Sequence, residues 1–328
     1  MRRFRILSLD GGGIKGTFSA SFLAELEKMT GKRVADYFDL ITGTSTGGII
    51  AIALGLGIGT EEILGFYEEM GPSIFPSTGV RRRTRDFLRH FLQPKHSGEV
   101  LKDAVRSVLG DRKFGESRVR LVITSYDAIR GSLHLFKTCH HERFKQDYRL
   151  PAADVAMATA AAPTYFPAFH GESGLTHIDG GIWANCPTMV GVVEAVGVLG
   201  CKPDEVDILS IGTTSEPFFV SKRKRFGGII LWNKGIADLL MQAQVAGSLA
   251  QAKVITGRRP MRINESTRPG RFALDDARQI NDLKALGISS ARHHEQEVSL
   301  RFLETPAKQF TPCYPIRPLA PREPFLAI

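Results

Sequence analysis

The pattern Gly43-Thr44-Ser45-Thr46-Gly47 constrains this chain most, because it separates a strand-like segment from a helix-like one. Residues 37–42 before it are a short strand candidate, and residues 49–56 after it are an apolar helix candidate. A serine on so sharp a turn exposes its Oγ, and flanking glycines remove side chains that would clash there. The helix N-terminus also favours negative charge on a reacting group. The pattern predicts a nucleophile at Ser45, although a GxSxG pattern alone is a weak signal.

Other segments repeat this alternation of strand and helix. Residues 4–9, 118–125 and 206–212 are further candidates for buried strands, and residues 17–29 carry apolar side chains at helical spacing. Strands that alternate with helical stretches indicate an α/β sandwich with a largely parallel central sheet.

No linker or internal repeat divides the 328 residues. We therefore expect one main domain over residues 4–215, with residues 216–328 as a C-terminal extension packed on the same domain. From about Pro306 the extension is rich in proline, which predicts a segment with little regular structure that wraps the surface.

The formal net charge of +9 favours anionic partners such as phospholipid surfaces, nucleotides or nucleic acid. Two basic runs, residues 81–85 and 222–225, are candidates for docking on anionic lipid, and solvated loop charge is the alternative. No nucleic-acid recognition motif accompanies the charge, so we expect no nucleic-acid partner.

The four cysteines are far apart and form no CxxC pair, which argues against a disulfide framework and a zinc site. The longest nearly uncharged apolar run, residues 47–59, is shorter than the roughly 20 residues of a spanning helix. The first residues also lack the features of a signal peptide. These observations predict a cytoplasmic protein that approaches any lipid from the water side.

A second glycine-rich turn, Asp10-Gly11-Gly12-Gly13-Ile14-Lys15-Gly16, follows the first strand candidate. Successive glycines can turn several N–H groups toward one point and form an oxyanion hole, in which each donor contributes roughly 3–4 kcal/mol. Gly11, Gly13 and Gly16 also match the GxGxxG dinucleotide-binding pattern, with Asp36 and Asp39 at about the expected distance downstream. Taken alone, this turn fits either interpretation.

A third turn, Asp179-Gly180-Gly181, presents an aspartate whose carboxylate could act as a base. By itself it could be an ordinary Asp-Gly turn. A serine nucleophile, a donor-rich loop and a carboxylate together make a complete acyl-transfer site, whereas hydride transfer uses only one of the three turns. We therefore favour acyl transfer with Ser45 as nucleophile and Asp179 as base.

A Ser-His-Asp triad is the mechanistic rival. His293 or His294 follows Asp179 in the order common in α/β-hydrolases, but both lie in a polar stretch typical of a solvated helix face. His177 precedes Asp179 by two residues, a spacing that places both side chains on one face of a strand.

The blocks DGGGIKG, GTSTGG and DGGIWANCP, in this order, resemble the patatin-like phospholipases, and the resemblance covers roughly residues 4–290. It implies a three-layer α/β/α patatin-like sandwich. It also implies a catalytic dyad of Ser45 and Asp179, an oxyanion hole from the backbone of Gly11, Gly12 and Gly13, and no cofactor or metal. The substrate class that it implies is membrane glycerophospholipid.

Within this family the chain looks like the cyclic-nucleotide-activated phospholipase effectors of bacterial CBASS anti-phage defence. That likeness implies activation by a cyclic dinucleotide such as cyclic GMP-AMP, in the cytoplasm and peripherally on the inner membrane, with homo-oligomerisation left open. The alternatives are a constitutive bacterial lipase or lysophospholipase without nucleotide control, and a catalytically silent lipid-binding scaffold.

Overall fold

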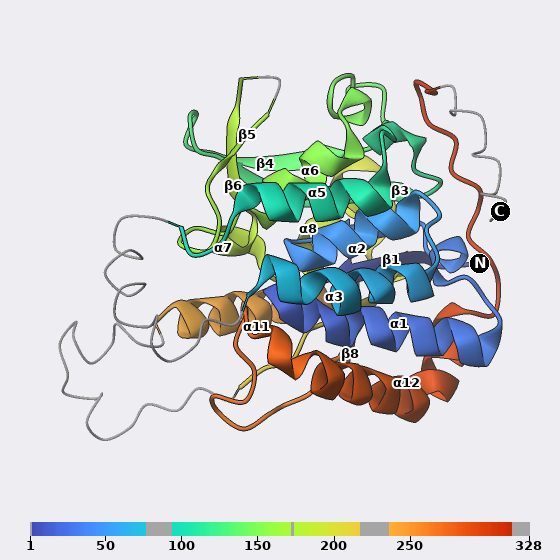
Figure 1. Cartoon of the computed structure of the whole chain (residues 1–328). Coiled ribbons are helices and arrows are strands. Elements are labelled where there is room, and N and C mark those ends of the chain that lie inside the picture. The colour runs from blue at the N-terminus through green and yellow to red at the C-terminus, as the bar shows by residue number, and fades with distance from the viewer. Residues whose placement is uncertain (1, 77–93, 172–173, 217–235, 317–328) are drawn as a thin grey trace, which may run out of the picture.

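A computed structural model describes residues 2–76, 94–171, 174–216 and 236–316. Within these ranges the chain forms one eight-stranded sheet between two layers of helices (Figure 1). The basic runs at 81–85 and 222–225 lie outside the described residues, so their proposed role in lipid docking stays a prediction.

The sheet has the order β5-β6-β3-β2-β1-β7-β8, and β4 pairs with β3. Its central strands run parallel, as the alternation of strands and helices predicts. The antiparallel pairs all lie at the end of the sheet that contains β4, β5 and β6. The strands are β1 (Phe4–Leu9), β2 (Leu40–Gly43), β3 (Arg120–Asp127), β4 (Ser132–Lys137), β5 (Phe169–His170), β6 (Thr176–Asp179), β7 (Val206–Ile211) and β8 (Met261–Ile263).

Two strands share one edge of β3 and meet end to end. In β2, Gly43 lies opposite Ile123, and in β6, Asp179 lies opposite Ser125. Because β4 pairs with the same stretch of β3 that both of them contact, it must occupy the other edge of β3. The carboxyl ends of β2 and β6 therefore point toward each other, and the turns that follow them converge.

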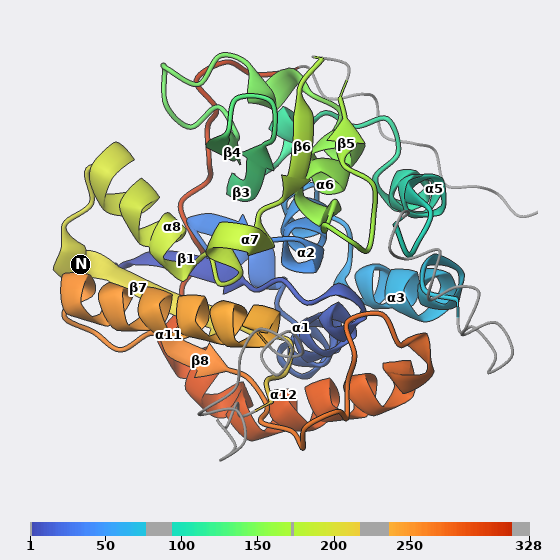
Figure 2. The ribbon, with the colours of Figure 1, turned by 90° about the vertical axis from the view of Figure 1, so that its left-hand side faces the viewer.

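The two helical layers bury opposite faces of the sheet (Figure 2). Successive strand residues alternate between the faces, so Ile6 and Ile208 enter the smaller core, while Leu7 and Leu209 enter the larger one. This arrangement confirms the predicted three-layer α/β/α sandwich. The larger layer consists of α1 (Gly16–Thr30), α2 (Thr46–Gly55), α3 (Thr60–Ile74), α5 (Gly98–Leu109), α6 (Ala152–Ala160) and α12 (Ile280–Phe302); the other consists of α7 (Gly181–Ala184), α8 (Thr188–Val193) and α11 (Ile236–Thr256).

The strand and helix around the serine differ slightly from their predicted limits. β2 begins at Leu40, because residues 34–37 form a 3₁₀ turn. Helix α2 begins at Thr46, three residues earlier than the sequence predicts. Gly47 lies inside this first turn, where a Cβ atom would be only 2.3 Å from the Leu9 carbonyl oxygen. The glycine therefore lets α2 start directly against the end of β1.

Residues beyond 215 contribute to both the sheet and the larger helical layer. β8 pairs with β7, and α12 packs along α1. Arg301 on α12 donates to the buried Asp207 of β7 at 2.5 Å. From Leu303 to Ile316 the chain has neither helix nor strand, as the proline-rich composition predicts. The division at residue 215 stays a prediction.

Gly287 lies where α12 packs closely against α1, so a substitution at this position tests the packing of the two helices. A Cβ atom there would lie 2.0 Å from the Ser21 Oγ and 2.5 Å from the Phe18 carbonyl oxygen. We expect Gly287→Ala to lower the free energy of unfolding by about 1–3 kcal/mol, despite the better helix propensity of alanine. In α11, a Cβ atom added at Gly247 would meet no atom within 4 Å, so Gly247→Ala should be neutral or stabilising. Urea denaturation of both variants measures this, and equal midpoints would contradict the tight packing.

Candidate active site

Ser45 occupies the sharp turn between β2 and α2 with φ 54° and ψ −125°. This left-handed backbone is unusual for a residue with a side chain and costs of order 1–3 kcal/mol. Its N–H donates to the Thr159 Oγ1 at 2.9 Å, and that hydroxyl in turn donates to the Thr124 carbonyl oxygen at 2.6 Å. A hydroxyl on α6 thus ties the strained turn to β3.

Asp179 ends β6 and lies on the cavity wall together with Ser45. Its backbone N–H donates to the Ala161 carbonyl oxygen at 3.0 Å, and its Oδ1 accepts the Gly181 N–H at 2.6 Å. Burial raises the pKa of the carboxyl to about 6, although hydrogen bonds from the Ser45 hydroxyl and the Gly181 N–H lower it. A carboxylate with such a pKa is a better base near neutral pH than an exposed aspartate.

The first glycine loop lies against the Ser45 turn and the segment after β7, because a Cβ atom at Gly11 would be 3.3 Å from the Ser45 Cβ and one at Gly12 would be 2.8 Å from the Thr213 Cβ. Gly12 and Gly13 line the cavity, and Gly13 has φ +56°. The Gly11 N–H donates to the Asn185 carbonyl oxygen at 2.9 Å, so this amide holds the loop against the turn that follows Asp179. Of the predicted trio, Gly12 and Gly13 line the same cavity as Ser45, whereas Gly11 packs against the Ser45 side chain and its amide is already engaged.

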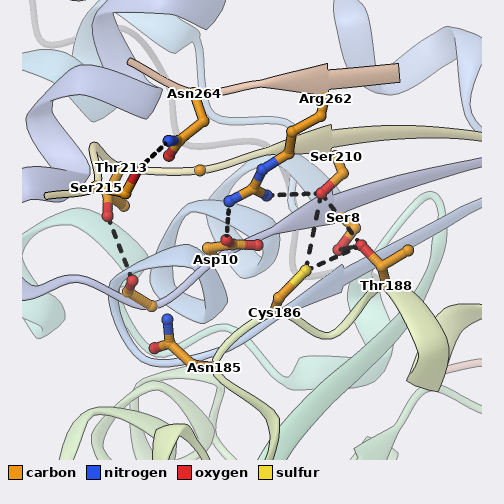
Figure 3. Close-up of polar contacts among 12 residues, drawn as sticks. Ser8, Asp10, Asn185, Cys186, Thr188, Ser210, Thr213, Ser215, Arg262 and Asn264 are labelled. Atoms are coloured by element: carbon orange, nitrogen blue, oxygen red, sulfur yellow. Dashed lines mark hydrogen bonds and ion pairs between the residues drawn. The ribbon is translucent and has the colours of Figure 1, made fainter. Parts of the chain in front are cut away.

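An ion pair holds Asp10, the residue that precedes these glycines (Figure 3). Arg262 of β8 donates to the Asp10 Oδ2 at 2.5 Å and to the Ser210 Oγ at 2.7 Å. Burial lowers the pKa of Arg262, but the Asp10 carboxylate and its neighbours raise it by more, so the net direction is upward. The pair joins the end of β1 to β8 and fixes the position where the glycine loop begins.

The cavity at this site has a volume of about 490 Å³, within the range of small-molecule sites. Ser45 and Asp179 supply polar groups on its wall, and most of the remaining lining is apolar. The wall could therefore hold a hydrocarbon chain with a carbonyl group near Ser45. Many of the large apolar side chains come from α3 and the residue after it, from the loop after α6 and from α11: Phe66, Tyr67, Ile74, Phe75, Tyr165, Phe166, Leu240 and Met241.

The histidines of the rival triad lie elsewhere, and no histidine in the described ranges lines this cavity. His177 is buried against the rings of His134 and Phe136, and burial lowers its pKa to about 4. His293 and His294 lie on α12, and His294 Nδ1 is 2.9 Å from the Ser290 carbonyl oxygen.

The positions of Asp36 and Asp39 argue against a dinucleotide-binding site at the glycine loop. Asp36 and Asp39 precede β2, at the amino edge of the sheet, whereas the glycine loop lies at the carboxyl edge. Ligands of such folds bind outside the carboxyl ends of the strands. Asp39 is instead paired with Arg2 at 2.5 Å. Lys15, in the same loop, donates to the Thr214 carbonyl oxygen at 3.3 Å.

Comparison with known proteins identifies the family. The family model described as "Patatin-like phospholipase" matches residues 7–192. The chain belongs to the patatin-like phospholipases. This confirms the predicted resemblance and the predicted enzyme class, a hydrolase of lipid esters.

Named relatives of this patatin-like chain include bacterial enzymes. It is 34% identical over 288 residues to the "cGAMP-activated phospholipase" of Pseudomonas aeruginosa, covering 86% of this chain and 82% of that protein. It is 35% identical over 262 residues to the protein of the same name from Vibrio cholerae, covering 74% of each. The crystal structure of VipD from Legionella pneumophila aligns with a TM-score of 0.42 and 12% identity, over 90% of this chain and 67% of that one.

Neither a membrane span nor a metal centre is found in the described ranges. None of the helices there combines the length and apolar character needed to cross a bilayer. In the same part of the chain, no group of three or more His, Cys, Asp or Glu side chains is arranged to hold a metal ion.

The raised pKa of Asp179 predicts how this enzyme's stability depends on pH. The folded-state pKa of about 6 exceeds the ordinary value of 3.8, so the folded protein binds this proton more tightly than the unfolded chain does. The cost of ionising this carboxyl is small at pH 4, grows between pH 4 and pH 6, and levels off at about 2–3 kcal/mol above pH 6. Asp179→Asn removes this cost, so we expect it to raise the free energy of unfolding by that amount near pH 7.5.

Urea denaturation near pH 7.5 and near pH 4 measures this difference. Asp103→Asn, at an exposed position of α5, is the matched control for the loss of one carboxylate. If Asp179→Asn shifted the midpoint equally at both pH values, the raised pKa would be wrong.

Proposed function

We propose that this chain is a phospholipase with a Ser45–Asp179 dyad that releases fatty acids from membrane glycerophospholipids. The observation that carries the proposal is the shared position of the two residues. A serine on a strained turn and a buried carboxylate with a raised pKa lie together on the wall of an apolar cavity. The family assignment supplies the class of ester.

In the first half of the reaction, Asp179 accepts the proton of the Ser45 hydroxyl while Oγ attacks the ester carbonyl carbon of the lipid. A tetrahedral intermediate forms with a negatively charged oxygen. When it collapses, the C–O bond to the glycerol breaks, and the leaving alkoxide takes the proton from Asp179. The products are a lysophospholipid and an acyl group on Ser45.

The N–H groups of Gly12 and Gly13 are the donors that we assign to the oxyanion. Both residues line the cavity that Ser45 also lines, and the start of α2 contributes favourable positive potential. The Gly11 amide already binds the Asn185 carbonyl oxygen, so its part is to hold the loop against the Asp179 turn.

In the second half, Asp179 accepts a proton from water as that water attacks the acyl carbon. The proton then returns to Ser45 Oγ as the acyl bond breaks, and the fatty acid leaves. The apolar side chains of the cavity hold the hydrocarbon chain through both steps. No cofactor is required, because water is the only co-reactant.

Control by a cyclic dinucleotide is the regulatory part of the proposal. The relatives from Pseudomonas aeruginosa and Vibrio cholerae are both named cGAMP-activated phospholipases, and each covers most of this chain. We extend that activation to this chain, with cyclic GMP-AMP as the first ligand to test. In this role the enzyme works in the cytoplasm, peripherally on the inner membrane, and degrades its lipid as part of antiviral defence.

Ser45→Ala should lower fatty-acid release from phosphatidylglycerol–phosphatidylethanolamine liposomes by roughly 10⁴-fold or more, because it removes the nucleophile. The assay contains cyclic GMP-AMP, so that an enzyme awaiting its activator is not mistaken for an inactive one. His293→Ala, on the exposed face of α12, should keep near wild-type activity. Substantial release by Ser45→Ala would contradict the dyad, and loss of activity in His293→Ala would favour the triad.

A further inference from the structure

A second cavity, of about 890 Å³, lies at the amino edge of the sheet, opposite the edge that carries Ser45. Its walls come from four segments that are distant in sequence, so only the folded chain forms it. They are residues 31–39 after α1, residues 54–57 at the end of α2, residues 115–119 before β3, and the stretch between Pro306 and Ile316. The last of these is the red segment at the right of Figure 1.

Four cationic side chains surround this cavity: Lys32, Arg33, Arg118 and Lys308. None of the four makes a salt bridge with a carboxylate in the described part of the chain. Lys32 and Arg33 donate to backbone carbonyl oxygens at 2.7 and 2.8 Å, and the Lys32 ammonium lies 5.7 Å from the Tyr37 ring centroid. Their charges are therefore available to an anion.

The acidic residues of the same wall are largely engaged. Asp39 pairs with Arg2 and accepts the Arg5 N–H at 2.9 Å. Glu116 accepts the Lys113 N–H at 3.0 Å, while Asp36 is exposed to solvent. The cavity lining carries four cations against three carboxylates, and Arg2 neutralises one of these, so its net charge is positive and favours an anionic ligand.

Aromatic rings add a surface on which a nucleobase can stack. Tyr37 is half-buried and lines the cavity. Phe310 lies in the wall, and the Arg120 guanidinium is 5.1 Å from its ring centroid. Cations beside aromatic rings are the combination that proteins use for phosphates joined to bases.

The wall of this cavity also adjoins helix α2 and strand β2, the two elements that flank Ser45. Helix α2 extends from the Ser45 turn to Gly55, which lies in the cavity wall. Strand β2 extends from the residue after Asp39, in the same wall, to the residues before Ser45. A ligand that shifts these walls therefore acts on both sides of the catalytic turn through rigid elements.

We propose that this second cavity binds a cyclic dinucleotide, with Lys32, Arg33, Arg118 and Lys308 on its two phosphates and Tyr37 against a base. The inference rests on the nucleotide control in the proposed function and assigns its site. The dinucleotide acts by setting the position of the Ser45 turn, at the opposite end of the 10-residue helix α2, without touching the substrate.

The test compares a double charge reversal in the cavity, Arg118→Glu with Lys308→Glu, with a control of equal charge change. The control is Lys253→Glu with Arg268→Glu, at exposed positions that line neither cavity. Calorimetric titration with cyclic GMP-AMP and other cyclic dinucleotides gives Kd, and liposome hydrolysis gives the activating concentration. We expect both to rise at least about tenfold in the cavity variant and to stay unchanged in the control. Urea denaturation of all three proteins without ligand should give equal midpoints, which shows that they are folded.

The possible outcomes test the location of the dinucleotide site separately from nucleotide control itself. Unchanged affinity and activation in the cavity variant would overturn the assignment of this cavity and leave nucleotide control in place. If no cyclic dinucleotide binds the wild type, both the assignment and the nucleotide control fail, while the Ser45→Ala result still decides the hydrolase chemistry. Inorganic phosphate that displaces the dinucleotide with similar affinity would show a general anion site and would also overturn the proposal.

Discussion

The proposed active site depends on the way in which β2 and β6 share one edge of β3. Hydrogen bonding places Gly43 and Asp179 two positions apart along this edge, opposite Ile123 and Ser125. The antiparallel direction of β6 matters, because a parallel strand over the same stretch of β3 would place Asp179 opposite Asp127, two positions farther from Gly43. The register of one strand therefore brings together a serine and a carboxylate from distant parts of the chain.

The surrounding structure holds Ser45 and Asp179 in energetically unfavourable states. Ser45 has a positive φ, and Asp179 keeps a carboxyl in a buried place that raises its pKa. The Thr159 hydroxyl accepts the Ser45 N–H and stabilises its turn, and the Gly181 N–H donates to the Asp179 carboxylate. The larger core between the sheet and α1, α2 and α12 supplies the stability that offsets such local costs. Locally unfavourable features of this kind concentrate where a protein performs chemistry.

Much of this arrangement could be predicted from the sequence, because its signals are local. Gly43-Thr44-Ser45-Thr46-Gly47 and Asp179-Gly180-Gly181 each mark a turn by residue type, and the strand–helix alternation indicates the sandwich. The interactions between distant segments could not be predicted. Nothing in the residues near Asp10 indicates Arg262 as its partner, and nothing near Gly11 shows that its amide binds Asn185. The second cavity could not be predicted for the same reason, since its cations come from three separate segments.

The central claim is that a buried Asp179 is the base for Ser45, and the pH dependence of kcat/KM tests it most directly. The measurement uses a soluble ester with cyclic GMP-AMP present, from about pH 4 to about pH 8. Because the base must be ionised and its pKa is about 6, kcat/KM should fall about tenfold per pH unit below that value. A profile that stays flat down to about pH 4 would contradict the account.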